Sequence, residues 1–221
     1  RGVRPLIILR PAPGADRTAE KAMAMGLAVR LCPLFAAEAL AWTPPPAGDF
    51  DALLVTSAQT VRFGGVALQA YRALPTYAVG AATAEALREA GFADPVAGDG
   101  DASAIAARIA ADGHRAVLHL SGEAVAPMDA GPLRVTRIPV YRMMPLPCDP
   151  LDLRGGVLLV HSAAAGARLA EIVPENQRTT SDVVAISPAA LAACDSGWRS
   201  AQAADASNDA AVLALARRLC E

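Results

Sequence analysis

Small and hydroxyl-bearing residues recur in this chain where a short apolar run gives way to a turn or a helical stretch. The group consists of Ser57, Gly80, Ser121, Gly122, Ser162 and Ser187. Each residue alone is explained as a helix cap, which contributes about 1 kcal/mol to stability. As a set they predict several helix N-termini directed at one place, where backbone N–H groups would bind anions. The chemistry that this pattern favours is the binding of a polyanionic ligand.

Two other side chains could act on such a ligand. Arg10 follows the apolar run at residues 6–9. Its guanidinium could hold a carboxylate through two hydrogen bonds, or lie on the surface as an ordinary arginine. Tyr141 lies in an extended segment of alternating polarity at residues 135–142. Its phenol could donate a hydrogen bond to a leaving oxygen, or serve only in packing. The residue types alone leave both alternatives open in each case.

Composition and motifs exclude several other classes of protein. Hydrophobic residues make up 53% of the chain and charged residues 19%, which indicates a compact core rather than disorder. The net charge of −2 provides no basic field for nucleic acid. The apolar runs are broken within about ten residues and cannot span a bilayer, and the first ten residues do not resemble a signal peptide. The sequence contains no dinucleotide glycine fingerprint, no phosphate-binding loop and no Gly-x-Ser-x-Gly elbow.

Cysteine, lysine and histidine usage indicates neither a metal site nor covalent catalysis. The cysteines have no C-x-x-C pairing, which predicts separate reduced thiols: Cys32, Cys148, Cys194 and Cys220. The lone lysine, Lys21, is expected on an exposed helix face, which disfavours Schiff-base chemistry. The histidines lack metal-ligand spacing and are expected to be structural: His114, His119 and His161.

The elements that would position these residues form an internal repeat. The segment from Asp51 to Ala58 is echoed by the segment from Gly156 to Ala163, each an apolar run that opens into an alanine-rich stretch. A repeated unit of strand, small-residue loop and helix predicts two α/β halves with parallel sheets. Ligands of such sheets bind at the carboxyl ends of the strands. The repeat therefore predicts a site in the cleft between two halves.

The hydrophobic pattern assigns most of the chain to alternating strands and helices. Strands are expected at residues 6–10, 29–35 with an extension through 38–42, 52–56, 76–79, 116–120, 135–142, 157–161, 182–186 and 202–204. Helices are expected at residues 17–25 with Asp16 as the cap, from 57, 83–90, 101–111, 162–173, from 188, and after 207–209. Residues 121–123 are expected to form a turn. Proline clusters at 44–46 and 145–150 are candidates for crossings between domains.

Taken in order, these motifs resemble the uroporphyrinogen-III synthase family. The matching segments are Leu9-Arg10-Pro11; Val55-Thr56-Ser57-Ala58 with Val61; the run from Val79 to Leu87 with Ala90-Gly91; Val140-Tyr141-Arg142; His161-Ser162 with Gly166; and residues 206–213. They span nearly the whole chain. Each motif alone is weak, and the resemblance rests on their order and spacing.

The resemblance implies a hydro-lyase of porphyrin and heme biosynthesis. Such an enzyme closes hydroxymethylbilane, a polycarboxylate, to uroporphyrinogen III with loss of water and inversion of ring D through a spiro intermediate. The resemblance implies no cofactor and no metal, and it gives Tyr141 the role of assisting loss of the hydroxyl group. Electron-rich pyrroles expel that group readily, and uncatalysed closure yields the wrong isomer. The enzyme would mainly hold the substrate in one curled conformation.

The resemblance also implies a fold, a set of substrate contacts and partners. The fold is two doubly wound parallel-sheet α/β domains joined by a two-stranded extended linker, with residues 1–34 and 141–221 in one domain and 35–140 in the other. The expected substrate contacts are Arg10, Thr56, Ser57, Gly80, Thr83, Ser121, Gly122, Ser162, Ala163, Ala164 and Ser187. The family often has a threonine after the position of Ser187; its role cannot be transferred, because this chain has Ser187-Pro188-Ala189-Ala190.

A cytoplasmic monomer is expected, with hydroxymethylbilane as substrate and a transient contact with hydroxymethylbilane synthase, but no contact with nucleic acid or membrane. The main alternative is a non-catalytic two-lobed α/β protein that binds an anionic small molecule. A nicotinamide-dependent α/β enzyme is disfavoured by the missing glycine fingerprint.

Overall fold

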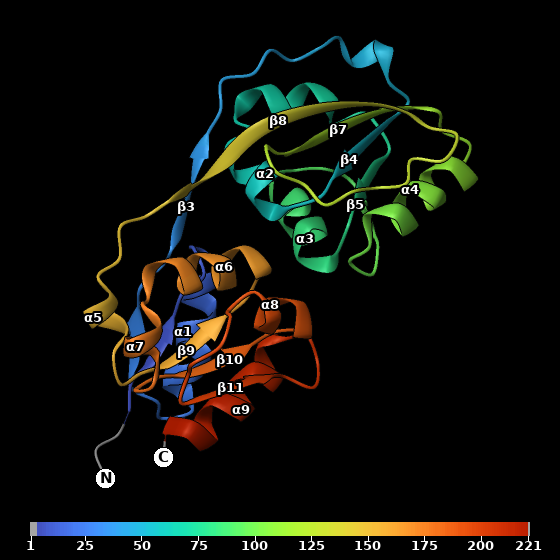
Figure 1. Cartoon of the computed structure of the whole chain (residues 1–221). Coiled ribbons are helices and arrows are strands. Elements are labelled where there is room, and N and C mark those ends of the chain that lie inside the picture. The colour runs from blue at the N-terminus through green and yellow to red at the C-terminus, as the bar shows by residue number, and fades with distance from the viewer. Residues whose placement is uncertain (1–3, 221) are drawn as a thin grey trace. The chain divides into compact units, whose positions relative to one another are not determined.

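The structure is a computed structural model that describes residues 4–220 (Figure 1). The chain divides into two compact units, each with its own sheet and core. The first unit is discontinuous: it contains the chain up to Ala36 and the chain from Pro145 onward. The second unit contains Ala37–Met144. The boundaries expected from the sequence lie at 34/35 and 140/141, a few residues earlier at each crossing.

The first unit contains a five-stranded sheet. Its strands are β1 (Leu6–Ile8), β2 (Val29–Leu31), β9 (Val157–Val160), β10 (Asp182–Ala185) and β11 (Ser200–Ala203). Their order across the sheet is β11-β10-β9-β1-β2, and all four neighbouring pairs are parallel. Parallel strands share one direction, so their carboxyl ends lie along a single edge.

Helices cover both faces of this sheet. They are α1 (Gly14–Ala24), α5 (Pro150–Leu153), α6 (Ala163–Ile172), α7 (Glu175–Arg178), α8 (Pro188–Ala192) and α9 (Asp209–Cys220). Successive strand side chains point to opposite faces. Ile7 and Leu158 therefore pack with α5, α6 and α8, whereas Leu6 and Leu159 pack with α1 and α9.

The second unit contains a six-stranded sheet of order β3-β8-β7-β4-β5-β6. Its strands are β3 (Phe35–Ala39), β4 (Ala52–Val55), β5 (Thr76–Ala78), β6 (Val96–Ala97), β7 (Ala116–Gly122) and β8 (Arg134–Pro145). The pairs β8-β7, β7-β4, β4-β5 and β5-β6 are parallel. The predicted mixed α/β fold with parallel sheets is confirmed.

Helices also lie on both faces of the second sheet. They are α2 (Ala58–Phe63), α3 (Ala81–Glu89), α4 (Ala102–Ala111) and two 3₁₀ turns, η1 (Ala47–Asp49) and η2 (Val66–Tyr71). Leu53 and Leu118 pack with α3 and η2. Leu54 and Val117 face the other way and pack with α4.

Side-chain caps fix where several helices begin. Four N-cap residues have extended backbones, and the side chain of each accepts a hydrogen bond from amides in the first turn of its helix. They are Ser57 for α2, Asp101 for α4, Ser162 for α6 and Ser187 for α8. At the other end of α3, Gly91 has φ +86°, a left-handed conformation in which glycine avoids a steric penalty.

Two helix starts differ from the sequence-based prediction. Helix α1 begins at Gly14 and not at Arg17, because the Ala15 amide already donates to the carbonyl of Pro11. Asp16 therefore lies in the first turn instead of capping it. Helix α3 begins at Ala81, with Gly80 at the N-cap, so Thr83 lies inside its first turn.

The prediction of one extended strand from residue 29 to residue 42 is wrong, because two separate strands lie in this segment. Strand β2 ends at Leu31 and β3 starts at Phe35, and the two belong to different sheets. Pro33 lies between them and has no amide proton to continue a ladder.

The predicted turn at 121–123 is also wrong. Strand β7 continues through Ser121 and Gly122, because β8 pairs with it to the end, across an irregularity that brings Gly122 opposite Tyr141. No helix in the described part of the chain is long and apolar enough to cross a membrane.

Candidate active site

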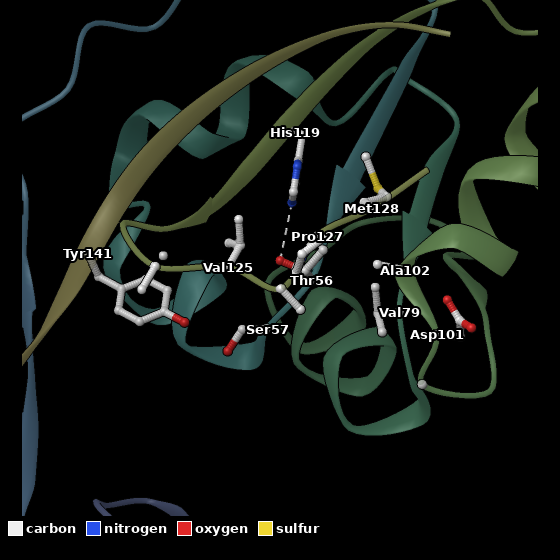
Figure 2. A pocket seen from close by; sticks show the side chains of 14 residues that line it. Thr56, Ser57, Val79, Asp101, Ala102, His119, Val125, Pro127, Met128 and Tyr141 are labelled. Atoms are coloured by element: carbon white, nitrogen blue, oxygen red, sulfur yellow. Dashed lines mark hydrogen bonds between the residues drawn. The ribbon is translucent and has the colours of Figure 1, made fainter. Parts of the chain in front are cut away.

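A pocket of about 500 Å³ lies within the second unit, at the carboxyl ends of β4, β5 and β7 (Figure 2). Its lining residues are Thr56, Ser57, Val79, Gly100, Asp101, Ala102, His119, Gly122, Ala124, Val125, Ala126, Pro127, Met128 and Tyr141. The carboxyl end of a parallel sheet is where α/β proteins bind ligands. Four residues expected from the sequence to form the site therefore meet here: Thr56, Ser57, Gly122 and Tyr141.

Tyr141 is held in one position by its neighbours. It lies on β8, is 9% exposed, and stacks on Phe63 with ring centroids 6.0 Å apart. Gly122 lies directly against the ring: a Cβ built on Gly122 would be 2.8 Å from Tyr141 Cζ and 2.9 Å from its hydroxyl oxygen. Such contacts are closer than packed atoms tolerate, so glycine at 122 is what lets the phenol lie against β7. A buried ring with its hydroxyl at a pocket can serve as a proton donor.

Thr56 and His119 form a hydrogen-bonded pair in the same pocket. Thr56 Oγ1 lies 3.2 Å from His119 Nε2 (Figure 2). His119 is 3% exposed, and burial, with a smaller contribution from the Arg137 charge, lowers its pKa to about 4. At neutral pH the imidazole is therefore uncharged, and it shares one hydrogen bond with the Thr56 hydroxyl. The pair orients the Thr56 hydroxyl without placing a charge in the pocket.

Two helix caps also border the pocket. The Ser57 hydroxyl accepts from the Gln59 amide at 3.2 Å, and the Asp101 carboxylate accepts from Ser103 and Ala104 amides at 2.7 and 3.2 Å. The Asp101 carboxylate thus already uses the amides at the start of α4. This helix end presents a negative side chain to the pocket, which makes it a poor place for an anionic ligand.

Three expected site residues of the second unit do not line the pocket. Gly80 serves as the backbone cap of α3, and Thr83 is 7% exposed inside that helix. Ser121 is fully buried, and its hydroxyl donates to the Gly122 carbonyl at 2.9 Å. The prediction that Ser121 lies in a turn was wrong, because β7 continues through this residue and its side chain is buried.

The expected site residues of the first unit lie past the carboxyl ends of β1, β9 and β10. Ser162 Oγ accepts from the Ala165 amide at 3.1 Å, and Ser187 Oγ accepts from the Ala190 amide at 3.2 Å. Both serines are therefore helix caps. Ala163 and Ala164 form the exposed first turn of α6, so no bulky side chain covers the amides at this helix start.

Arg10 belongs to a cluster of charges centred on Asp209. Arg10 Nη1 lies 3.2 Å from Asp209 Oδ1, and Lys21 Nζ lies 3.2 Å from Oδ2. Thr18 Oγ1 donates to the same carboxylate at 3.1 Å. Burial lowers the pKa of Arg10, and the charge of Asp209 opposes that shift. Two cations share one carboxylate, so the cluster keeps a net positive charge beside the end of β1.

His161 completes this cluster as an uncharged member. Its Nε2 lies 3.3 Å from Asp209 Oδ1, and its side chain is 5% exposed. Burial, followed by the charge of Arg10, lowers its pKa to about 4, although Asp209 acts in the opposite direction. The sequence had suggested only a structural role, and nothing in its spacing indicated the contact with Asp209.

Sequence reasoning also missed His119, Asp101 and the loop 124–128 as pocket residues. The signal for His119 was weak: a polar residue in the middle of an apolar strand. Within residues 4–220, no group of three or more His, Cys, Asp or Glu side chains is arranged to hold a metal ion.

The fold and pocket define an α/β protein whose candidate site is built from strand ends, a phenol and hydroxyl groups, without a nucleotide-binding glycine loop. A family model described as uroporphyrinogen-III synthase HemD matches residues 16–213. The chain belongs to the uroporphyrinogen-III synthase family, and this family consists of lyase-class enzymes of tetrapyrrole biosynthesis.

Solved structures show the same fold. The uroporphyrinogen-III synthetase of Helicobacter pylori is 16% identical, with 98% of this chain and 99% of that chain covered and a TM-score of 0.68. A mutant uroporphyrinogen III synthase from the extremely thermophilic bacterium Thermus thermophilus is 17% identical, with 96% and 98% covered and a TM-score of 0.51. No curated protein is detectably similar to this chain in sequence.

Proposed function

We propose that this chain converts hydroxymethylbilane to uroporphyrinogen III in the pocket around Tyr141, with loss of water and inversion of ring D. Besides family membership, one observation supports this proposal most strongly. The Tyr141 phenol forms part of a pocket wall at the carboxyl end of a parallel sheet and packs against Gly122, a residue without a side chain.

In the proposed step, Tyr141 donates a hydrogen bond to the hydroxymethyl oxygen as it leaves. The electron-rich pyrrole expels the hydroxyl group, and the proton donated in the transition state allows it to leave as water. Thr56, oriented by neutral His119, contacts the same end of the substrate. Only groups of this chain and the substrate's own ring electrons take part.

The carboxylates of the substrate require positive partners. We assign this role to the Arg10–Lys21–Asp209 cluster with its net positive charge, and to the exposed first turn of α6. Both flank carboxyl ends of strands in the first unit.

The isomer assay tests the function. The protein is incubated with enzymatically made hydroxymethylbilane, and the products are oxidised and separated as porphyrin isomers. The proposal expects isomer III in amounts proportional to enzyme. Formation of isomer I alone, at the rate seen without protein, would reject it in favour of a non-catalytic binding protein.

The role of Arg10 predicts a defect in binding. Arg10→Ala should raise KM by about 10- to 150-fold while kcat changes little, because a charge-assisted hydrogen bond contributes about 1.5–3 kcal/mol. Lys21→Ala is the matched control: it removes the other cation from Asp209, but its side chain is 58% exposed, and its effect should be smaller. Equal KM values for wild type and Arg10→Ala, at low and moderate salt, would show that Arg10 serves only Asp209.

The first turn of α6 gives a separate prediction. Ala164→Asp should leave the fold at least as stable, because a negative charge near a helix N-terminus contributes about 0.3–1 kcal/mol. The same charge should raise KM several-fold by competing with substrate carboxylates, and added salt should reduce the effect. Ala167→Asp is the control, since it places the same charge on an exposed position one turn further along. Wild-type kinetics in a stable Ala164→Asp variant would eliminate this helix end from the binding site.

A further inference from the structure

Two cysteines that are far apart in sequence lie together in the first unit. Cys32 Sγ and Cys148 Sγ are 3.2 Å apart, although 116 positions separate them in the chain. Both are half-buried thiols. The expectation of separate cysteines is therefore wrong for this pair, because sequence spacing carries no information on which segments the fold brings side by side.

Both cysteines lie on the segments that lead to and from the second unit. Cys32 lies between β2 and β3, and Cys148 lies between β8 and α5. The Cys32 amide donates to the Ile8 carbonyl at 3.0 Å, and the Leu146 amide donates to the Leu34 carbonyl at 2.9 Å. The first bond fixes the Cys32 segment to the end of β1, and the second joins it directly to the segment that carries Cys148.

The other two cysteines are enclosed in the core. Cys194 is 0% exposed and Cys220 is 2% exposed. Cys194 Sγ also donates to the Ala190 carbonyl at 3.2 Å. A reagent in solution therefore reaches the Cys32–Cys148 pair before either of these residues.

We propose that Cys32 and Cys148 form a redox site, at which a small-molecule disulfide of the glutathione class oxidises the pair to an intramolecular disulfide. The Cys32 thiolate attacks one sulfur of R–S–S–R, so that one RS⁻ leaves and a mixed disulfide forms. Cys148 then loses its proton and attacks the Cys32 sulfur, and the second RS⁻ leaves. Two protein thiols are oxidised, and one R–S–S–R is reduced to two RSH.

The order of the two attacks follows from the environment of Cys148. Burial raises the pKa of Cys148 to about 12, and its contact with Cys32 acts in the same direction. Cys148 thus keeps its proton while Cys32 reacts, and it acts as the resolving thiol. A disulfide requires the sulfurs to approach to ~2.05 Å, a closure of about 1 Å that side-chain rotation can supply.

The disulfide would join the two chain pieces from which the first unit is built. It closes a loop that contains the whole second unit, residues 37–144. A bond across so long a loop restricts the unfolded chain strongly, so the oxidised protein should resist unfolding better than the reduced protein. Reduction by thiols would restore the form without the cross-link.

The test treats the full-length protein with oxidised glutathione and then alkylates it under denaturing conditions. The expected result is a loss of about 2 Da before alkylation, two alkylated cysteines after it, and a Cys32–Cys148 cross-linked peptide. The Tm of the oxidised protein should be higher by about 5–10 °C, and dithiothreitol should reverse all of these changes. In Cys148→Ser the reaction should stop at the mixed disulfide between Cys32 and glutathione. The Cys32→Ser variant should remain largely unmodified. Cys194→Ala, the control, should oxidise like wild type. Four alkylated cysteines after treatment, or glutathione adducts on wild type without the cross-link, would overturn the proposal.

Discussion

Tyr141→Phe is expected to lower kcat about 10²-fold, because a positioned proton donor contributes at least that factor to the departure of a poor leaving group. KM and Tm should change little, because phenylalanine keeps the ring that stacks on Phe63 at 6.0 Å and packs against Gly122. Steady-state formation of isomer III gives kcat, and a thermal melt verifies the fold. Residual activity remains, because electron-rich pyrroles expel the hydroxyl group without help.

Two companion variants define the role of Tyr141 further. Gly122→Ala places a Cβ about where the Tyr141 ring now lies, so it should displace the phenol and reduce kcat as well. Tyr77→Phe removes another phenol of the same unit, which donates to Asp112 at 2.9 Å outside the pocket, and it should leave kcat unchanged. Undiminished turnover by a folded Tyr141→Phe enzyme would remove this residue from the mechanism.

Acidification is expected to destabilise the protein between about pH 6.5 and pH 4. The pKa values of His119 and His161 are lowered from 6.5 to about 4, mainly by burial. In this window the unfolded chain binds protons that the folded chain does not, so stability falls as pH falls. The loss between pH 8 and pH 5 is about 2 kcal/mol per histidine, an order-of-magnitude figure from the size of the shift. Below pH 4 both states are protonated, and this contribution is constant.

Urea unfolding at pH 8 and pH 5 measures the effect. His119→Gln should roughly halve the pH dependence, because it removes one of the two buried histidines whose pKa is lowered. The pKa values of Asp182 and Asp209 are lowered by their cationic and hydroxyl partners despite burial, so their contribution is lost only at more acidic pH. Equal unfolding free energies at pH 8 and pH 5 would contradict the assignment of buried neutral histidines.

The parts of the fold that local sequence determines were predictable. Four-residue apolar runs at 52–55 and 157–160 are strands, and Ser57, Ser162 and Ser187 cap the helices that follow. These features depend on local hydrophobic periodicity and on a capping side chain that binds an amide two or three residues further along. Whether the capped helix ends hold substrate stays a prediction.

The parts that depend on pairing between distant strands were not predictable. Ser121 is buried because β8 extends the ladder of β7, and nothing in residues 121–123 indicates this. His119 reaches Thr56 only because β7 lies beside β4. Cys32 meets Cys148 across 116 positions because the fold brings two connecting segments together, where the Leu146 amide donates to the Leu34 carbonyl. Register between strands is a non-local property, and a single sequence gives it only weakly.

A crystal structure with an unreactive hydroxymethylbilane analogue that keeps its terminal oxygen tests the assignment of the active site most directly. The analogue should bind with that oxygen about 2.6–3.2 Å from the Tyr141 hydroxyl, beside Thr56 and over Gly122. An analogue bound with its terminal oxygen away from the Tyr141 pocket would contradict the account.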